Sequence, residues 1–297
     1  MTAVQISPSP TFVSSLFSQP DPMTDVQFHK VSTYIEHKVG IKMPETKKTM
    51  MQARLTSRLK ALDMHSYKEY LSYVFSNDTD ADEELVSMID VLTTNLTHFF
   101  REKEHFNVMM RTVLPTLASQ NVTIPKIWSA GCSTGEEAYT LSMVMQEFLR
   151  LHHNAFIDYE IRATDISTRA LEKAALAIYP MESVEEISEG LKRRYFLKSR
   201  QESKASVRVN KQTRDKVQFT RLNFMDDSYG PRCSQDIIFC RNVLIYFDKQ
   251  TQREVLSKLA SCLKPQGFLF LGHSETIFGM NLPLESIAPT VFRKTAS

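Results

Sequence analysis

The sequence of 297 residues lacks the features that mark membrane and secreted proteins. It has no apolar run that approaches the roughly 20 residues needed for a membrane-spanning helix. Residues 1–22 show no basic start followed by an apolar block, so no secretory signal is readable there. We therefore expect a cytoplasmic protein that does not insert directly into a membrane.

Cysteine is scarce as well. The four cysteines lie far apart, form no C-x-x-C pair and have no histidine at the spacing of a zinc site. A disulfide-rich secreted domain would be much smaller than this chain. We expect reduced, buried thiols and no metal ion at Cys132, Cys233, Cys240 and Cys262.

Neither sign of charge dominates, since 36 Lys and Arg residues stand against 34 Asp and Glu residues, a net charge of +2. This balance argues against a protein that binds nucleic acid by bulk electrostatics. An apolar content of 42% excludes a disordered or fibrous chain. The length suits one large domain or two modest ones.

The apolar pattern divides the chain into a tail and two domains. Residues 1–22 are rich in Ser and Pro and predict a flexible tail. Residues 23–92 contain no obvious strand and predict a small helical domain. Within it, Met51, Leu55, Leu59 and Leu62 recur at helical spacing and form one apolar stripe.

Residues 93–297 predict an α/β domain in which strands and helices alternate. Its strands are apolar and do not alternate with polar residues, which is typical of a mostly parallel sheet covered on both faces. The predicted strands are Lys126–Ala130, Tyr159–Ala163, Gln235–Cys240 and Phe268–Leu271, and the predicted helices include Ser167–Ala177 and Thr251–Leu263. Two short alternating segments, Ser206–Val209 and Val217–Phe219, surround a polar turn. They predict an inserted antiparallel hairpin at about residues 195–222.

Polar and glycine residues follow two of the predicted strands, where open parallel sheets bind their ligands. Gly131 and Gly135 permit a tight turn after Lys126–Ala130, and the next helix offers unpaired N–H groups. A plain tight loop is the alternative. The Asp165 carboxylate suits the two hydroxyls of a ribose, or else caps the helix that starts near Ser167.

Two further groups are candidates for the same site. Asn223 and Phe224 suit the edge and ring of an adenine, or else a turn and the core. Arg241 and Asn242 end a buried strand and therefore need partners or a cleft. Tyr246 follows four residues after Asn242, where its hydroxyl reaches a reacting group or packs in the core.

A polar segment lies just before the sheet, at the predicted domain junction. Thr94, Asn95, Thr97 and Arg101 alternate there with apolar side chains. Domain interfaces are common sites for small molecules, and a solvated helix start is the alternative.

Taken together, these residues closely resemble the chemotaxis receptor glutamate methyltransferases of the CheR type. The match runs in order from about Val26 to Phe292. The matching strings are TNLTxFFR (94–101), WSA (128–130) with STGEE (133–137), DI (165–166), IFCRNVxIYFD (238–248), LKPxG (263–267) and GHSE (272–275). The resemblance implies an all-α domain followed by a Rossmann-like, S-adenosylmethionine-dependent methyltransferase domain with a small antiparallel β-subdomain.

The resemblance also implies the residues of the site. The cofactor, S-adenosyl-L-methionine, leaves as S-adenosyl-L-homocysteine. Its predicted contacts are Asn95, Thr97, Arg101, Gly131, Glu137, Asp165, Asn223, Phe224, Arg241 and Asn242. Arg101 and Tyr246 match positions near the reacting methyl group and are the predicted catalytic residues. The implied reaction forms methyl esters on glutamates of chemoreceptor cytoplasmic helices during chemotactic adaptation.

Receptor docking has its own candidates. Chemoreceptor methylation helices are acidic, and Lys47, Arg54 and Arg58 lie within about 40° of one another on a helix, so they form a predicted basic dock. A merely solvated basic face is the alternative. Family members that grip a receptor C-terminal tail have a glycine-containing loop, whereas Lys198–Ala205 contains no glycine, which argues against tail binding.

Other functions fit the same sequence less well. A nucleic-acid methyltransferase that acts on base amino groups typically has prolines where this chain has Asn242-Val243-Leu244. A dinucleotide dehydrogenase needs a G-x-G-x-x-G turn, which is absent. A small-molecule methyltransferase stays open, and a non-catalytic scaffold would have no need for Arg101 and Tyr246.

Overall fold

The computed structural model describes residues 20–76, 78–200, 205–230 and 234–295. Most of the predicted tail at residues 1–22 lies outside these ranges. So do Cys233 and the middle of the glycine-free loop at residues 198–205.

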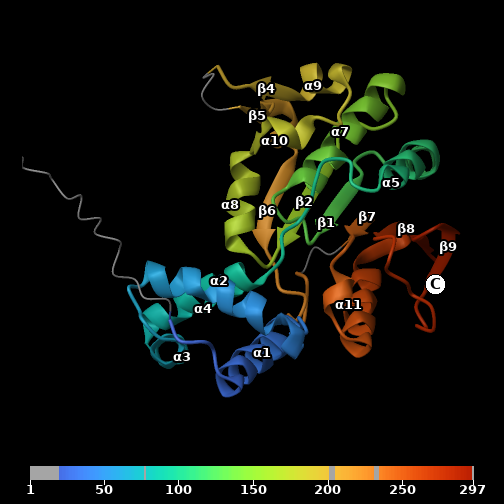
Figure 1. Ribbon diagram of the computed structural model, residues 1–297. Helices are drawn as coiled ribbons and strands as arrows, with labels where there is room; N and C mark the ends of the chain where they lie inside the picture. The colour runs from blue at the N-terminus through green and yellow to red at the C-terminus, as the bar shows by residue number, and fades with distance from the viewer. Residues whose placement is uncertain (1–19, 77, 201–204, 231–233, 296–297) are drawn as a thin grey trace, which may run out of the picture.

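Among the described residues up to Leu92, four α-helices form the N-terminal part of the molecule, at the lower left of Figure 1. They are α1 (Asp25–Val39), α2 (Lys48–Ala61), α3 (Tyr67–Val74) and α4 (Thr79–Leu92), with the 3-10 turn η1 (Glu45–Lys47) before α2. Thr24 and Gln27 form a capping box at the start of α1. Met51, Leu55 and Leu59 are buried in a core that these helices build among themselves, so the predicted apolar stripe is confirmed.

A seven-stranded sheet forms the centre of the remaining chain (Figure 1), in the order β6–β2–β1–β7–β8–β10–β9. Its strands are β1 (Lys126–Ala130), β2 (Glu160–Asp165), β6 (Val217–Arg221), β7 (Gln235–Cys240), β8 (Leu263–Leu271), β9 (Leu284–Ala288) and β10 (Val291–Lys294). The strands from β6 to β8 pair in parallel, whereas β10 is antiparallel to both β8 and β9. The predicted parallel core is confirmed, and the antiparallel edge is an addition that the sequence patterns did not reveal.

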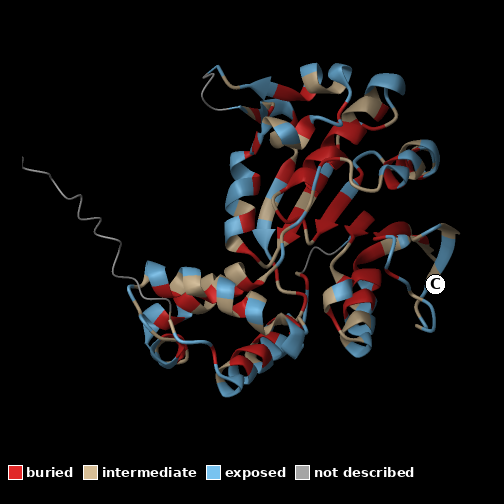
Figure 2. Ribbon diagram, in the orientation of Figure 1, coloured by how far each residue is buried: buried red, intermediate tan, exposed pale blue. Residues whose placement is uncertain are grey.

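Helices cover both faces of this sheet. They are α5 (Lys103–Val108), the π-helical turn η2 (Met109–Val113), α6 (Leu114–Ser119), α7 (Glu136–Leu151), α8 (Thr168–Leu176) and α11 (Lys249–Cys262). Ile127 and Phe239 belong to one core cluster, while their neighbours Trp128 and Ile238 belong to another. Because successive strand residues point to opposite faces, the two clusters lie on the two sides of the sheet. Figure 2 shows the central strands as buried.

The inserted subdomain is a small antiparallel sheet in the order β3–β5–β4. Its elements are β3 (Ile178–Pro180), η3 (Met181–Val184), α9 (Glu189–Tyr195), β4 (Phe196–Lys198) and β5 (Ser206–Val209), and α10 (Lys211–Arg214) follows. The predicted pairing of residues 206–209 with residues 217–219 is wrong, because the latter belong to β6 and pair with β2. In β6, Val217 is buried and the Phe219 ring lies 5.6 Å from that of Tyr139. Burial against α7 overrides the local hairpin pattern.

In the described ranges, no helix combines the length and the apolar character required to cross a membrane. Cys132 and Cys240 are buried free thiols, as expected. Cys262 is disulfide-bonded, so the expectation of a reduced thiol is wrong for that residue.

Candidate functional site

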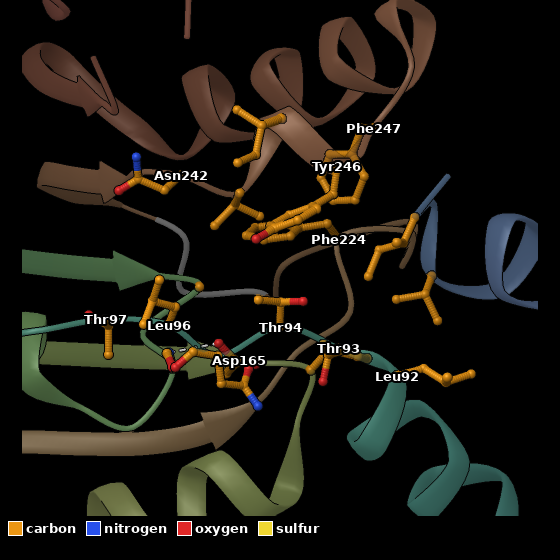
Figure 3. A pocket seen from close by; sticks show the side chains of 18 of the residues that line it. Leu92, Thr93, Thr94, Leu96, Thr97, Asp165, Phe224, Asn242, Tyr246 and Phe247 are labelled. Atoms are coloured by element: carbon orange, nitrogen blue, oxygen red, sulfur yellow. Dashed lines mark hydrogen bonds between the residues drawn. The ribbon is translucent and has the colours of Figure 1, made fainter. Parts of the chain in front are cut away.

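A pocket lies between the helical N-terminal part and the carboxyl ends of β1, β2 and β7. The strand order reverses between β1 and β7, which is where open α/β sheets bind ligands. The space in and above the pocket, including the part that is open to solvent, is about 1200 Å³. Figure 3 shows Asn242 and Tyr246 on one side of it and Thr97 and Asp165 on the other. All the predicted cofactor and catalytic residues line it: Asn95, Thr97, Arg101, Gly131, Glu137, Asp165, Asn223, Phe224, Arg241, Asn242 and Tyr246.

The turn after β1 requires its two glycines. Gly131 and Gly135 have φ angles of +84° and +94°, in the left-handed region that favours glycine. A Cβ at Gly131 would lie 2.4 Å from Val243 Cγ2, and one at Gly135 would lie 2.8 Å from Ala174 Cβ. The helix α7 begins directly after Gly135, which places Glu137 of its first turn in the pocket wall.

Asp165 stands at the pocket end of β2. Its Oδ2 accepts the Ser133 N–H at 2.8 Å, and its Oδ1 accepts the Ser167 N–H at 2.9 Å. Burial raises the pKa of the Asp165 carboxyl, and the two N–H groups act in the opposite direction. The N-cap of α8 is Ser167, whose hydroxyl accepts the Ala170 N–H, so the capping alternative for Asp165 is wrong.

Asn223 and Phe224 have the internal contacts of a turn residue and a core residue, which is one of their two interpretations. The Asn223 side chain forms a turn, because its Oδ1 accepts the Met225 N–H at 3.0 Å and its Nδ2 donates to the Lys38 carbonyl at 2.6 Å. The Phe224 ring packs edge-on against Tyr229, with 5.8 Å between ring centroids. Both residues nevertheless line the pocket. Asn223 therefore keeps one amide N–H for a ligand, and Phe224 adds apolar surface to the wall.

Arg241 is a buried residue of the pocket wall, and its Nε and Nη1 have several partners. Its Nε donates to Glu137 Oε2 at 2.7 Å, and 2% of the Arg241 side chain is exposed. Its Nη1 donates to the Arg101 carbonyl at 2.8 Å, lies 3.3 Å from Glu102 Oε2 and 3.0 Å from His105 Nδ1. The prediction that Arg241 needs partners or a cleft is confirmed, since it has both.

Sequence reasoning missed Glu102 and His105, although Glu102 directly follows a matching string. Glu102 Oε1 accepts the Asn242 side-chain amide at 3.2 Å. Burial alone would raise the pKa of Glu102, but the Asn242 hydrogen bond and the Arg241 charge outweigh it and lower that pKa. Burial and the Arg241 charge lower the pKa of His105 to about 4, so His105 is neutral at pH 7.

Glu102, His105 and His273 also have the geometry of a metal cluster, with one ligand atom each within 4.8 Å of the others. The Arg241 guanidinium already lies beside two of these groups, Glu102 and His105. A second cation would meet its repulsion at close range. We therefore interpret this cluster as part of the support beneath the pocket.

Glu275 is a third residue that sequence reasoning missed, although it ends a matching string. Its Oε1 accepts the Val243 and Leu244 N–H groups at 2.9 and 2.8 Å. Its Oε2 accepts the Gly272 and Asn242 N–H groups at 2.6 and 3.0 Å. Burial raises the pKa of the Glu275 carboxyl, against the effect of these four donors. The carboxylate holds the loop after β7 in place, including Asn242 with its φ of +60°.

Arg101 and Tyr246, the two predicted catalytic residues, are partly buried, whereas Arg241 is buried. Arg101 Nη1 donates to the Leu96 carbonyl at 3.0 Å. Tyr246 belongs to the 3-10 turn η4 (Leu244–Tyr246), and the Lys42 N–H donates to its carbonyl at 2.9 Å. Lys47 Nζ lies 5.7 Å from the centre of the Tyr246 ring. The helical N-terminal part therefore contacts the predicted catalytic loop directly.

The three predicted docking residues do not share one environment. Lys47 lines the pocket. Arg54 Nη1 donates to the Leu92 and Thr93 carbonyls at 2.8 and 2.9 Å, which caps the end of α4. Arg58 forms a bidentate ion pair with the buried Glu84, at 2.9 and 2.6 Å. Their role in docking stays a prediction.

Comparison with known proteins shows which protein family the sequence matches. The family model described as "CheR methyltransferase, SAM binding domain" matches residues 95–292, and "CheR methyltransferase, all-alpha domain" matches residues 27–93. The chemotaxis protein methyltransferase of Borreliella burgdorferi is 36% identical over 277 residues, which cover 92% of this chain and 95% of that protein. That of Salmonella typhimurium is 35% identical over 253 residues, or 85% of this chain and 84% of that protein.

A solved structure of the glycopeptide N-methyltransferase MtfA with S-adenosylmethionine is also similar. It has a TM-score of 0.30 and 12% identity, and the match covers 53% of this chain and 51% of that one. A likeness at this level adds no conclusion.

Proposed function

The chain belongs to the CheR methyltransferase family, and from that premise we propose that it methylates glutamate side chains on the cytoplasmic helices of chemotaxis receptors. Family membership makes it an S-adenosylmethionine-dependent methyltransferase of the chemotaxis system. The observation that carries the proposal is the single pocket lined by all the predicted cofactor and catalytic residues. We propose a cytoplasmic location, where the receptor helices are accessible.

The polar and apolar groups that line the pocket suit the separate parts of S-adenosylmethionine. The Asp165 carboxylate lies at a β-strand end and still has lone pairs free for the two hydroxyls of a ribose. Phe224 and Asn223 offer an apolar wall and an amide N–H for the adenine. Arg241 and Asn242 form the opposite end, where an amino-acid group would bind.

Bound S-adenosylmethionine supplies a methyl carbon on a positively charged sulfur: the O–CH₃ bond forms, the S–CH₃ bond breaks and its electron pair stays on sulfur. A glutamate carboxylate is ionised at pH 7, with an ordinary pKa near 4.3, so the chain needs no general base. The work of the protein is to position the carboxylate and to exclude water.

Two residues are proposed for that work. Arg101 and Tyr246 both line the pocket, and the guanidinium of Arg101 has no carboxylate partner among the described residues. Arg101 orients the acceptor carboxylate by charge, and the Tyr246 hydroxyl donates a hydrogen bond to it.

Docking of the acidic receptor helix is proposed to use Lys47, Arg54 and Arg58. Lys47 lies at the pocket, whereas Arg54 and Arg58 belong to the adjoining helix α2. The internal contacts of Arg54 and Arg58 leave only part of their donors for a partner. The loop at residues 198–205 contains no glycine, which argues against binding of a receptor C-terminal tail, and a binding assay with receptor C-terminal peptides tests this point.

The proposal is tested with S-adenosylmethionine labelled in its methyl group and with membranes that contain chemoreceptors. We expect the label to enter the receptor as an ester that mild base releases as methanol. Asp165→Ala should abolish cofactor binding and transfer, whereas the exposed Asp215→Ala should retain both. Failure of the wild-type protein to bind the cofactor, or a label that base does not release, would overturn the proposal.

A further inference from the structure

We propose that Leu96 and Ile245 form an apolar lip at the pocket entrance, and that this lip packs against the receptor helix beside the reacting glutamate. The inference rests on the proposed function and adds the surface that the substrate meets. Leu96 is 78% exposed and Ile245 is 50% exposed. Among the exposed large apolar side chains of the described residues, these two alone line the pocket.

The backbone on both sides of the lip is held firmly. The Leu96 carbonyl accepts Arg101 Nη1 at 3.0 Å. Ile245 lies within η4, whose Leu244 N–H donates to Glu275 at 2.8 Å. Single exposed aliphatic side chains are common on protein surfaces, so what distinguishes these two is their place, since both line the pocket.

The two residues approach the entrance from different elements. Leu96 belongs to the segment between α4 and α5, whereas Ile245 belongs to the loop after β7. Figure 3 shows Leu96 across the pocket from Tyr246, the residue that follows Ile245. A segment that inserts one side chain into the pocket would therefore contact the lip on two sides.

The polarity of the pocket defines the partner. Lys47 and Arg101 line the pocket as well, and neither forms an ion pair with a carboxylate among the described residues, so both positive charges are available to a partner. A fitting substrate has an anionic tip on a flexible side chain, and aliphatic or small apolar groups beside it. On a helix, positions three and four residues away share the face of the glutamate. The lip therefore selects a helix with such residues at those positions.

Covering the lip also has a chemical consequence. The reaction joins an anionic oxygen to a carbon on a cationic sulfur, so the separate charges disappear as the bond forms. Water stabilises the separated charges more than the less polar transition state. Two aliphatic side chains pressed against the acceptor helix exclude water and favour the reaction.

The test compares Leu96→Ser, Ile245→Ser and their double variant with matched controls. Leu151→Ser and Ile157→Ser change aliphatic side chains that are 58% and 80% exposed and that do not line the pocket. Binding of a receptor cytoplasmic fragment is measured by calorimetry in the presence of S-adenosylhomocysteine, so that no turnover occurs. Titration of S-adenosylhomocysteine alone reports the cofactor site.

We expect the double variant to bind the fragment at least about tenfold more weakly, with S-adenosylhomocysteine affinity unchanged, because a few side chains next to the buried centre of an interface carry most of its binding free energy. In the receptor fragment, serine can replace the apolar residues three and four positions from the glutamate. This change should weaken the binding of the fragment to the wild-type protein, and it should have little further effect on the binding of the fragment to the double variant. The proposed lip is wrong if the double variant binds S-adenosylhomocysteine normally and binds the fragment with an affinity within twofold of that of the controls. A wild-type protein that does not bind S-adenosylhomocysteine would instead overturn the proposed function.

Discussion

Arg241 Nε lies 2.7 Å from Glu137 Oε2, and this buried ion pair forms the lower wall of the pocket. The two side chains come from the loop after β7 and the first turn of α7, so the pair joins the two halves of the parallel sheet at the point where the strand order reverses. It has a structural role in addition to its predicted place at the cofactor.

Replacing Arg241 with Met should therefore destabilise the fold strongly. Removing one partner from a buried ion pair costs about 3–5 kcal/mol, because the remaining carboxylates of Glu137 and Glu102 lose their counter-charge. Urea unfolding, followed by fluorescence of the single Trp128, measures the loss. The control Arg293→Met breaks the more exposed pair with Glu285 and should cost less than about 1 kcal/mol. Equal losses in the two variants would contradict this interpretation.

Glu275 is predicted to be a positioning residue for the loop that carries Asn242 and Tyr246. Glu275→Ala leaves four N–H donors, two of them in buried hydrogen bonds, without their carboxylate, at about 1–3 kcal/mol for each donor that water does not reach. We expect cofactor affinity to fall at least about tenfold. Glu275→Gln keeps one acceptor oxygen and should recover part of it.

The readout is the dissociation constant for S-adenosylmethionine at a temperature where all variants stay folded. Glu285→Ala, on the exposed edge strand β9, is the control for loss of a carboxylate. If Glu275→Ala is folded and binds the cofactor normally, the loop does not depend on Glu275.

Tyr246→Phe separates cofactor binding from methyl transfer. The variant removes only the hydroxyl and keeps the ring that Lys47 contacts. Turnover on receptors should fall, while the affinity for S-adenosylmethionine stays nearly unchanged. Single-turnover kinetics with Tyr73→Phe in α3 as a control measures the effect. Full turnover in Tyr246→Phe would remove this hydroxyl from the mechanism.

The local signals in the sequence were sufficient for the pocket but not for what lies beneath it. Gly131 and Arg241 directly follow β1 and β7, Asp165 ends β2, and parallel strands bring their carboxyl ends to one edge, so the convergence of these residues was predictable. Glu102 and Glu275 bind the pocket residues through three-dimensional contacts across 139 and about 30 residues of chain. No spacing rule encodes such contacts.

The same limit explains the error in the inserted subdomain. Val217 and Phe219 alternate with polar residues, as a hairpin arm would, but their apolar side chains gain more from the helix-covered edge of the main sheet. Alternation defines a strand and its buried face, whereas the choice of neighbouring strand depends on tertiary burial. The pairing of Ser206–Val209 with β3 and β4 follows from that choice.

The role of Arg58 in docking has to be tested separately from its role in folding, because Arg58 forms an internal ion pair. Arg58 neutralises Glu84, which is 4% exposed and also accepts the Tyr70 hydroxyl at 2.8 Å. Arg58→Met alone should therefore destabilise the helical domain by up to about 3 kcal/mol. The double variant Arg58→Met with Glu84→Met removes both charges and should regain most of this stability.

If the basic face of α2 docks the acidic receptor, the double variant should still show a raised KM for receptors at low salt, and the difference should shrink as salt increases. Arg54→Gln should act in the same direction. If the folded double variant has the receptor kinetics of the wild type at every salt concentration, Arg58 takes no part in receptor docking.

His105 should make the fold sensitive to acid in a definite direction. Burial and the neighbouring Arg241 lower the pKa of His105 to about 4, from an ordinary value of 6.5. Between these two pH values the unfolded chain binds a proton that the folded chain does not, so the free energy of unfolding falls as the pH falls through 6.5. Above pH 6.5 both states are neutral and this contribution is constant.

The comparison of wild type with His105→Gln isolates this effect, because the glutamine does not titrate. Asp165, Glu136 and Glu275 have raised pKa values and act in the opposite sense, but they do so in both proteins and cancel in the difference. Between pH 7.5 and pH 5, the wild type should lose about 2 kcal/mol more than the variant in urea unfolding. Parallel profiles would mean that His105 takes up its proton in the folded protein near pH 6.5, and that the Arg241 guanidinium does not hold it neutral.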